Sequence, residues 1–265
     1  VDQGYAYQLL DALDTETPEL TLVGELHQNL VREARATKGE DEVARIRDVA
    51  RRTVDVVAKT VQFLQSCAVG EDEILRQPDG TVLSVGDVHE HINYLIAANR
   101  LEDPEGFIFA TGRDAGIPHS RGAREKSIRL GESIVFDLFP RENGGGYFFD
   151  ITRTFCLGYA PEEVQTLYDD TLACLNTLKE NVKVGKAARH YQQMACAFFE
   201  DRGYPTIAQD PTTVEGYVHG IGHGLGLEIH EAPSFQDASI NKARLKPGHV
   251  FTVEPGLYFP SRGMG

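Results

Sequence analysis

The sequence predicts an α+β fold in which helices cover one face of a mostly antiparallel sheet. Several segments repeat apolar residues every three or four positions, which is typical of amphipathic helices. Between them lie short runs rich in β-branched and aromatic residues, which predict strands. The two kinds of segment do not follow one another in a regular strand–helix order, and this argues against a wholly parallel sheet.

The first residues predict little structure of their own. A short helical pattern surrounds Tyr7, Leu9, Leu10 and Leu13, and the strand-like run LTLVGEL occupies residues 20–26. These two pieces are too few to form a domain. We therefore expect residues 1–37 to be the trailing part of a truncated N-terminal domain with its linker, and residues 38–265 to form the main domain, itself truncated at its C-terminal end.

The main domain begins with the strongest helical signal of the chain. Apolar residues recur at helical spacing from Val43 to Leu64, with acidic residues at the N-terminal end, where they favour a helix. Further helices are predicted after Asp87, from Pro161 onward, and in the segment that ends at Gly203. The predicted strands are FIFA at 107, SIVFDLF at 133, YFFDITRTFC at 147, LGLEI at 225 and HVFTVEPGLYF at 249.

Composition narrows the function classes. The chain has 265 residues, 41% of them hydrophobic, and a formal net charge of -14, which argues against a nucleic-acid binder. The four cysteines form no C-x-x-C pair, which favours buried thiols in a reducing compartment. No apolar run approaches the roughly 20 residues that cross a bilayer. We expect a cytoplasmic protein without a membrane partner.

Four residues of the C-terminal half have the chemistry of a metal site. Asp137 lies in VFDLF, Asp150 in FFDITRTF, His223 in HGIGHGLGLEIH and Glu254 in FTVEPG. Carboxylates and an imidazole are the ligands that divalent cations take from proteins. Other interpretations stay open at this point, because Asp137 could face solvent and Asp150 could form a salt bridge with Arg153.

The glycine-rich segment around His223 also carries His219 and His230. Three histidines so close together in apolar sequence are hard to explain by packing alone. No H-E-x-x-H motif occurs, so the zincin type of site is not indicated. The carboxylate-rich ligand set favours Mn²⁺, Co²⁺ or a pair of ions over a structural zinc.

The motifs FDITRTF, HGIGHGLGLEIHEAP and LKPGHVFTVEPGLY resemble those of the pita-bread-fold metallopeptidases, in particular the Xaa-Pro aminopeptidases and the Xaa-Pro dipeptidases, or prolidases. The resemblance spans roughly residues 38–265. It implies a pita-bread (creatinase/aminopeptidase) fold, with a curved sheet and helices on its outer face. It also implies hydrolysis of the bond between an N-terminal residue and proline by a metal-bridging hydroxide.

By the same resemblance, Asp137, Asp150, His223 and Glu254 would hold two divalent metal ions, with Mn²⁺ favoured over Co²⁺ and Zn²⁺. Glu254 would act as the general base. His230 would stabilise the tetrahedral intermediate or pass on a proton, and His219 and His119 would contact the substrate. The family's fifth ligand, a bridging glutamate, has no match before Gly265, and we expect it beyond that residue. The partners implied are a peptide with proline in second position and a second copy of the chain in a homodimer.

Two alternatives remain. One is another pita-bread hydrolase, resembling methionine aminopeptidase or creatinase, although relatives of creatinase generally lose the metal ligands that are present here. The other is a non-catalytic pita-bread module that binds peptides or proteins. Such a module would take up no tightly held Mn²⁺ and would be indifferent to a chelator.

Overall fold

The structure is a computed structural model that describes residues 3–22 and 30–265. The chain divides into two compact units, Val1–Ala34 and Arg35–Gly265. In the first unit, the predicted helix is confirmed as α1, Gln3–Glu16, which buries none of its residues. Residues 20–22 of the predicted LTLVGEL strand form no strand, while residues 23–26 and His27 lie outside the described residues. The assignment of residues 1–37 to a further domain stays a prediction.

The second unit begins at the end of α2, Leu30–Ala36, and continues into the long helix α3, Glu40–Ser66. The carboxylate of Glu42 accepts the Gly39 N–H at 2.7 Å and so fixes the start of α3. The next helix, α4, spans Val85–Ala98 and begins two residues before Asp87, because Ser84 Oγ accepts the Asp87 N–H and the Asp87 carboxylate accepts the Ser84 N–H. A short hairpin, β1 (Ala68–Val69) with β2 (Leu75–Arg76), precedes α4.

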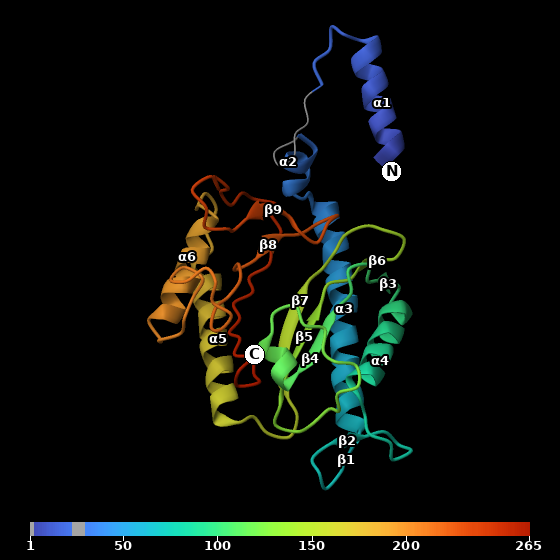
Figure 1. Ribbon diagram of the computed structural model, residues 1–265, viewed down its shortest axis with the longest axis vertical. Helices are drawn as coiled ribbons and strands as arrows, with labels where there is room; N and C mark the ends of the chain where they lie inside the picture. Colours follow the sequence, from blue (N-terminus) through green and yellow to red (C-terminus); the bar gives the residue numbers. More distant parts are fainter. Residues whose placement is uncertain (1–2, 23–29) are drawn as a thin grey trace. The chain divides into compact units, whose positions relative to one another are not determined.

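An antiparallel sheet of three strands follows, in the order β4-β5-β7. Its strands are β4 (Ile108–Thr111), β5 (Ser133–Leu138) and β7 (Ile151–Cys156). A 3₁₀ turn, η1 (Gly112–Gly116), follows β4, and a small pair, β3 (Leu101–Glu102) with β6 (Arg141–Glu142), flanks the sheet. Figure 1 shows α3 and α4 beside these strands.

Side-chain alternation along β5 separates the hydrophobic core from the other face of the sheet. Ile134, Phe136 and Leu138 belong to the core that α3 and α4 form with the sheet. Because successive strand residues point to opposite faces, Val135 and Asp137 point away from those helices. The core comprises Val49, Val56, Val57, Leu64, Leu75, Leu83, Val85, Val88, Ile92, Leu95, Ile96, Leu101, Phe107, Phe109, Ile128, Ile134, Phe136 and Leu138.

The C-terminal half has its own hydrophobic core. It is built around α5 (Glu162–Asn181) and α6 (Arg189–Glu200), which contact each other along their length. Pro161 precedes α5 as predicted, whereas α6 ends three residues before Gly203. The small hairpin β8 (His223–Gly224) with β9 (Glu231–Ser234) lies in the same half (Figure 1). Tyr217, Ile221, Leu257 and Phe259 pack into this second core.

Two predicted strands differ from the structure. The prediction of a strand LGLEI is wrong, because residues 225–229 form the bend that joins β8 to β9. There the Gly226 N–H donates to the Glu228 carbonyl at 3.0 Å, which turns the chain back on itself. Residues 249–259 are extended but form only isolated bridges, since the His223 N–H donates to Thr252 Oγ1 instead of completing a backbone ladder.

The cysteines are free thiols. Cys174 and Cys196 are buried and Cys67 and Cys156 are partly buried. Burial raises the pKa of the Cys174 thiol to about 12, which keeps it protonated and unreactive at neutral pH. Within residues 3–22 and 30–265, no helix has the length and apolar character needed to span a membrane.

We expect Ile92→Ala to lower the free energy of unfolding by about 2–5 kcal/mol, because Ile92 is fully buried between α4 and the sheet and its removal leaves a cavity. Guanidinium unfolding measures this. Tyr94→Ala on the same helix is the matched control: Tyr94 is 70% exposed, so the change should stay within about 0.5 kcal/mol. Equal effects of the two substitutions would contradict the assignment of this core.

Candidate metal centre

Asp137 and Asp150 enter the site from neighbouring strands of the sheet. Asp137 lies near the end of β5 and pairs in register with Thr152 of β7. The Thr152 hydroxyl donates to Asp137 Oδ1 at 2.8 Å, so a cross-strand neighbour orients the carboxylate. Asp150 directly precedes β7. The sequence pattern placed it inside a longer strand, and the structure places it at the strand's entry.

His223 and Glu254 come from the C-terminal half by a second antiparallel pairing. The Thr252 N–H donates to the His223 carbonyl at 2.9 Å, and the Glu254 N–H donates to the Ile221 carbonyl at 2.8 Å. These two bonds bring residues far apart in sequence side by side. Thr252 Oγ1 also accepts the His223 N–H at 3.0 Å. Backbone pairing therefore fixes the positions of the Cα atoms of His223 and Glu254, from which both side chains extend.

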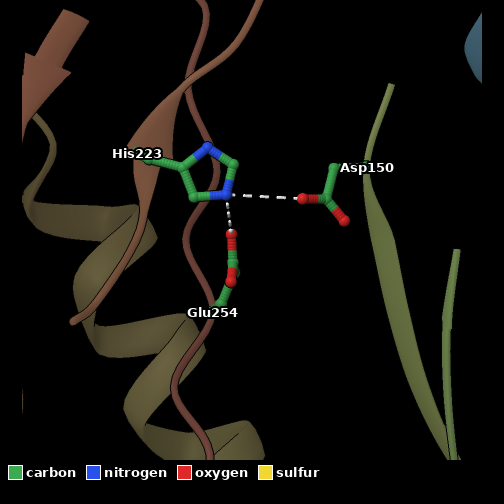
Figure 2. A group of neighbouring side chains, drawn as sticks. All are labelled: Asp150, His223 and Glu254. Atoms are coloured by element: carbon green, nitrogen blue, oxygen red, sulfur yellow. Dashed lines mark ion pairs between the residues drawn. The ribbon is translucent and has the colours of Figure 1, made fainter. Parts of the chain in front are cut away.

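Three of the four predicted ligands, Asp150, His223 and Glu254, meet in one cluster, and Asp137 lies beside it. His223 Nε2 lies 3.4 Å from Asp150 Oδ2 and 3.2 Å from Glu254 Oε1 (Figure 2). One ligand atom from each of these three residues lies within 4.8 Å of the others, a spacing that could hold a metal ion. Asp137 is outside this group of three, but it is close enough that the charges of Asp150 and Glu254 act on its carboxyl.

The orientation of His223 suits a metal ligand. Its Nδ1 lies 3.1 Å from the Gly224 carbonyl oxygen. We assign the proton to Nδ1, because a carbonyl can only accept. In the neutral ring, Nε2 then presents its lone pair to the cluster. A bond of this kind to the second ring nitrogen is usual for histidines that bind metals.

The electrostatics of the cluster call for a cation. Burial raises the pKa of Asp137 well above its usual range, and the charge of Asp150 raises it further. Burial also raises the pKa of Asp150, more than the hydrogen bond with His223 lowers it. Burial alone would lower the pKa of His223, but Asp150 and Glu254 outweigh it and raise the pKa to about 10. Carboxylates gathered in this way take up protons unless positive charge is supplied.

One atom of Glu254 also indicates that the cluster needs positive charge. Its Oε1 is buried and faces His223 Nε2 at 3.2 Å, but it makes no well-aligned hydrogen bond among the described residues. A buried carboxylate oxygen without such a bond is costly, and a cation would satisfy it. The pKa of Glu254 is nevertheless low, because the interaction with His223 outweighs the effect of burial. The donor set, its burial and this oxygen all fit a divalent metal ion.

The other predicted histidines lie around the cluster. The ring of His230 is 4.3 Å from that of His223, centroid to centroid. His219 has a buried Nε2 with no partner among the described residues, while its Nδ1 lies 2.7 Å from the Gly220 carbonyl oxygen. His119 is exposed, has a left-handed backbone with φ 61°, and its charge acts on His219. His89 and His91 pack against Phe107 and Phe63 respectively, in the first core.

Sequence reasoning missed Tyr258. Its ring centroid is 5.4 Å from that of His219, and burial, together with the charges of Asp137 and Glu254, raises the pKa of its hydroxyl above the usual value for tyrosine. A signal was available, because residues 254, 256 and 258 share one face of an extended segment. A side chain at Gly256 would meet Tyr258 and His219, so the small residue leaves room between them.

The sequence matches the profile of metallopeptidase family M24 over residues 22–265. The chain belongs to this family. It is 27% identical over 266 residues to the Xaa-Pro dipeptidase of Pyrococcus furiosus, covering 97% of this chain and 70% of that protein. The M24 chain also superposes on the prolidase structure from Pyrococcus furiosus with a TM-score of 0.71 and 28% identity, covering 88% of this chain and 61% of that one.

This M24 chain superposes on a crystal structure of X-Pro aminopeptidase from Thermotoga maritima with a TM-score of 0.75 and 24% identity. The superposition covers 96% of this chain and 64% of that chain, and at this identity it shows the fold alone. The prediction of an α+β pita-bread fold is confirmed. The M24 chain thus spans about two thirds of the length of these relatives.

We propose that the cluster binds a divalent metal ion. We expect His223→Ala to weaken Mn²⁺ binding by about 100-fold or more, because it removes the imidazole nitrogen that contacts both Asp150 and Glu254. Isothermal titration calorimetry measures the dissociation constant. His190→Ala on α6 serves as control and should bind Mn²⁺ as the unchanged protein does. Unaltered affinity in His223→Ala would exclude this cluster.

Metal uptake should release protons. At pH 7 His223, with a pKa of about 10 in the metal-free protein, carries a proton on Nε2 that must leave before this nitrogen can bind a cation. Mn²⁺ affinity should therefore rise with pH, by about tenfold per unit below pH 10 for one released proton. Calorimetry in buffers of different ionisation enthalpy counts the protons. Affinity that stays constant from pH 6 to pH 8 would contradict this assignment.

Proposed function

We propose that this chain is the catalytic part of a metal-dependent exopeptidase that hydrolyses the bond between an N-terminal residue and proline. The observation that carries the proposal is the convergence of Asp150, His223 and Glu254 in one cluster, with Asp137 beside it, within an M24 chain. Similarity to the Xaa-Pro dipeptidase of Pyrococcus furiosus supports the choice of substrate. The substrate class is a peptide with proline in second position.

In this proposal the four residues would hold two divalent ions. Mn²⁺ suits the set best, because three of the four ligands are carboxylates and one is an imidazole. When bound, such ions polarise a carbonyl group and lower the pKa of water. The charges agree with this assignment, since Asp137 and Asp150 otherwise have raised pKa values.

In this proposal Glu254 accepts the proton of the attacking water. The interaction with His223 keeps the pKa of Glu254 below its usual value despite burial, so the carboxylate is ionised at neutral pH. Its Oε1 faces His223 Nε2 at 3.2 Å without a well-aligned hydrogen bond among the described residues, so this carboxylate oxygen can accept a further one. A general base must have a free lone pair within reach of the proton it takes, and this oxygen has one.

The histidines have separate roles in the proposal. Partial burial lowers the pKa of His230 below its ordinary value, so its ring is mostly neutral at pH 7 and can donate a hydrogen bond to a developing oxyanion. His219 has an unpartnered buried Nε2 that can contact the substrate. His119, exposed beside it, would bind the substrate from the rim. The homodimer and the cytoplasmic location remain predictions.

The decisive assay compares an Xaa-Pro dipeptide with an Xaa-Pro-Yaa tripeptide in the presence of Mn²⁺, using protein that includes any residues following Gly265 in nature. Release of the N-terminal amino acid is measured by chromatography. We expect cleavage that a chelator abolishes and Mn²⁺ restores. Cleavage of the dipeptide alone defines a prolidase, and cleavage of the tripeptide defines an aminopeptidase. An Xaa-Ala dipeptide is the specificity control, and cleavage of neither proline peptide would refute the proposal.

Glu254→Gln should lower kcat by about 10²–10⁴-fold, because the amide cannot accept the proton while the shape of the side chain is kept. Metal content is measured alongside, since Glu254 is also a proposed ligand. Lys59→Met on α3 is a control remote from the site, because Lys59 forms only a surface ion pair with Asp55. Full activity of Glu254→Gln would exclude Glu254 as the base.

A further inference from the structure

We propose that Lys38 is a positioning residue that acts through Glu231 to hold His230 against the metal cluster. The inference rests on the proposed function only for the role of His230 in the reaction. The structural part, that Lys38 and Glu231 fix the bend that carries His230, stands on its own contacts. Lys38 precedes α3 and lies 193 positions before Glu231 in the sequence.

The two side chains form a buried ion pair. Lys38 Nζ lies 2.9 Å from Glu231 Oε2, and the side chains are only 1% and 6% exposed. Arg35 also binds the other oxygen of Glu231. A charge pair removed from water persists only where its geometry is good and its remaining acceptors are satisfied. Both oxygens of Glu231 have cationic partners, so this condition is met.

Glu231 closes the bend that carries His230. Its Oε1 accepts the N–H of Glu228 at 3.0 Å, which ties the start of the bend to its end. Glu231 is also the first residue of β9 and pairs with Gly224 of β8. His230 lies between these attachments, with its ring against that of His223. His230 itself is exposed, so packing alone does not hold it there.

Lys38 is anchored independently of the ion pair. Its N–H donates to the Gly248 carbonyl at 2.7 Å. A Cβ at Gly226 would lie 2.8 Å from Lys38 Cε and 2.5 Å from Glu231 Oε2. The absence of a side chain at Gly226 is therefore what admits the ion pair beneath the bend. Gly226→Ala therefore perturbs the Lys38–Glu231 ion pair from the side of the bend.

The proposed metal ligand His223 is held by contacts other than the Lys38–Glu231 ion pair. Its backbone is paired with Thr252, and its Nδ1 bonds to the Gly224 carbonyl. Loss of the Lys38–Glu231 pair should then displace His230 while the metal cluster stays assembled. A general loss of stability would instead affect both the position of His230 and the assembly of the metal cluster.

The experiment compares Lys38→Met with Lys59→Met, which breaks a surface ion pair on α3. We expect Lys38→Met to lower kcat by about 100-fold, as for a misplaced catalytic group, with KM and Mn²⁺ affinity within about threefold of the unchanged protein. Hydrogen exchange followed by mass spectrometry should show amides 227–232 exchanging at least about tenfold faster and those of α5 and α6 unchanged. Lys59→Met should alter none of these quantities.

A double-mutant cycle tests whether Lys38 affects kcat through His230. Because Lys38 acts through His230, adding Lys38→Met to His230→Ala should change kcat by less than about twofold. Glu231→Gln, which keeps the side-chain shape, and Gly226→Ala should reproduce the faster exchange if Lys38→Met fails to fold. Normal exchange at 227–232 in all three variants would overturn the inference, as would equal acceleration throughout the domain. If the unchanged protein cleaves no proline peptide, the proposed function fails, and hydrogen exchange still decides this inference.

Discussion

Negative charge buried around a single imidazole is the constraint on which the site depends. Asp137, Asp150 and Glu254 approach His223 in a place with little water, where like charges raise one another's pKa. Left alone, these groups would take up protons or move apart. They remain together because the backbone on either side is paired and packed before the side chains meet.

The two halves of the domain supply this support in a similar way. In the first, β5 and β7 deliver the two aspartates, and the core under α3 and α4 holds the strands in register. In the second, the segments around 221–223 and 252–254 deliver the histidine and the glutamate above the core of α5 and α6. Each pairing includes a threonine: Thr152 bonds to Asp137, and Thr252 bonds to the His223 backbone. The cluster forms where the two pairings meet.

The sequence predicted those features that local pattern determines. The periodicity from Val43 to Leu64 identified α3, and an aspartate amid the apolar residues of β5 identified Asp137 as a residue with a function. The pattern failed where tertiary contacts decide. LGLEI has the composition of a strand, but Gly226 and the hydrogen bond from Glu228 to Glu231 turn it into a bend. The metal ligands could be chosen by chemistry, whereas their distances required the fold.

Lys38 shows the limit of local reasoning most clearly. A lysine before an amphipathic helix reads as a solvated charge, and no spacing in the sequence connects it to Glu231. Only the fold brings the start of α3 beneath the bend between β8 and β9, where removing one partner would leave the other charge buried without it. The proposed metal ligands lie on or beside paired backbone, while His230 lies on a bend that Lys38 and Arg35 contact through Glu231. By these proposals the domain would bind metal and position His230 by separate contacts, and a substitution far from the cluster would alter one without the other.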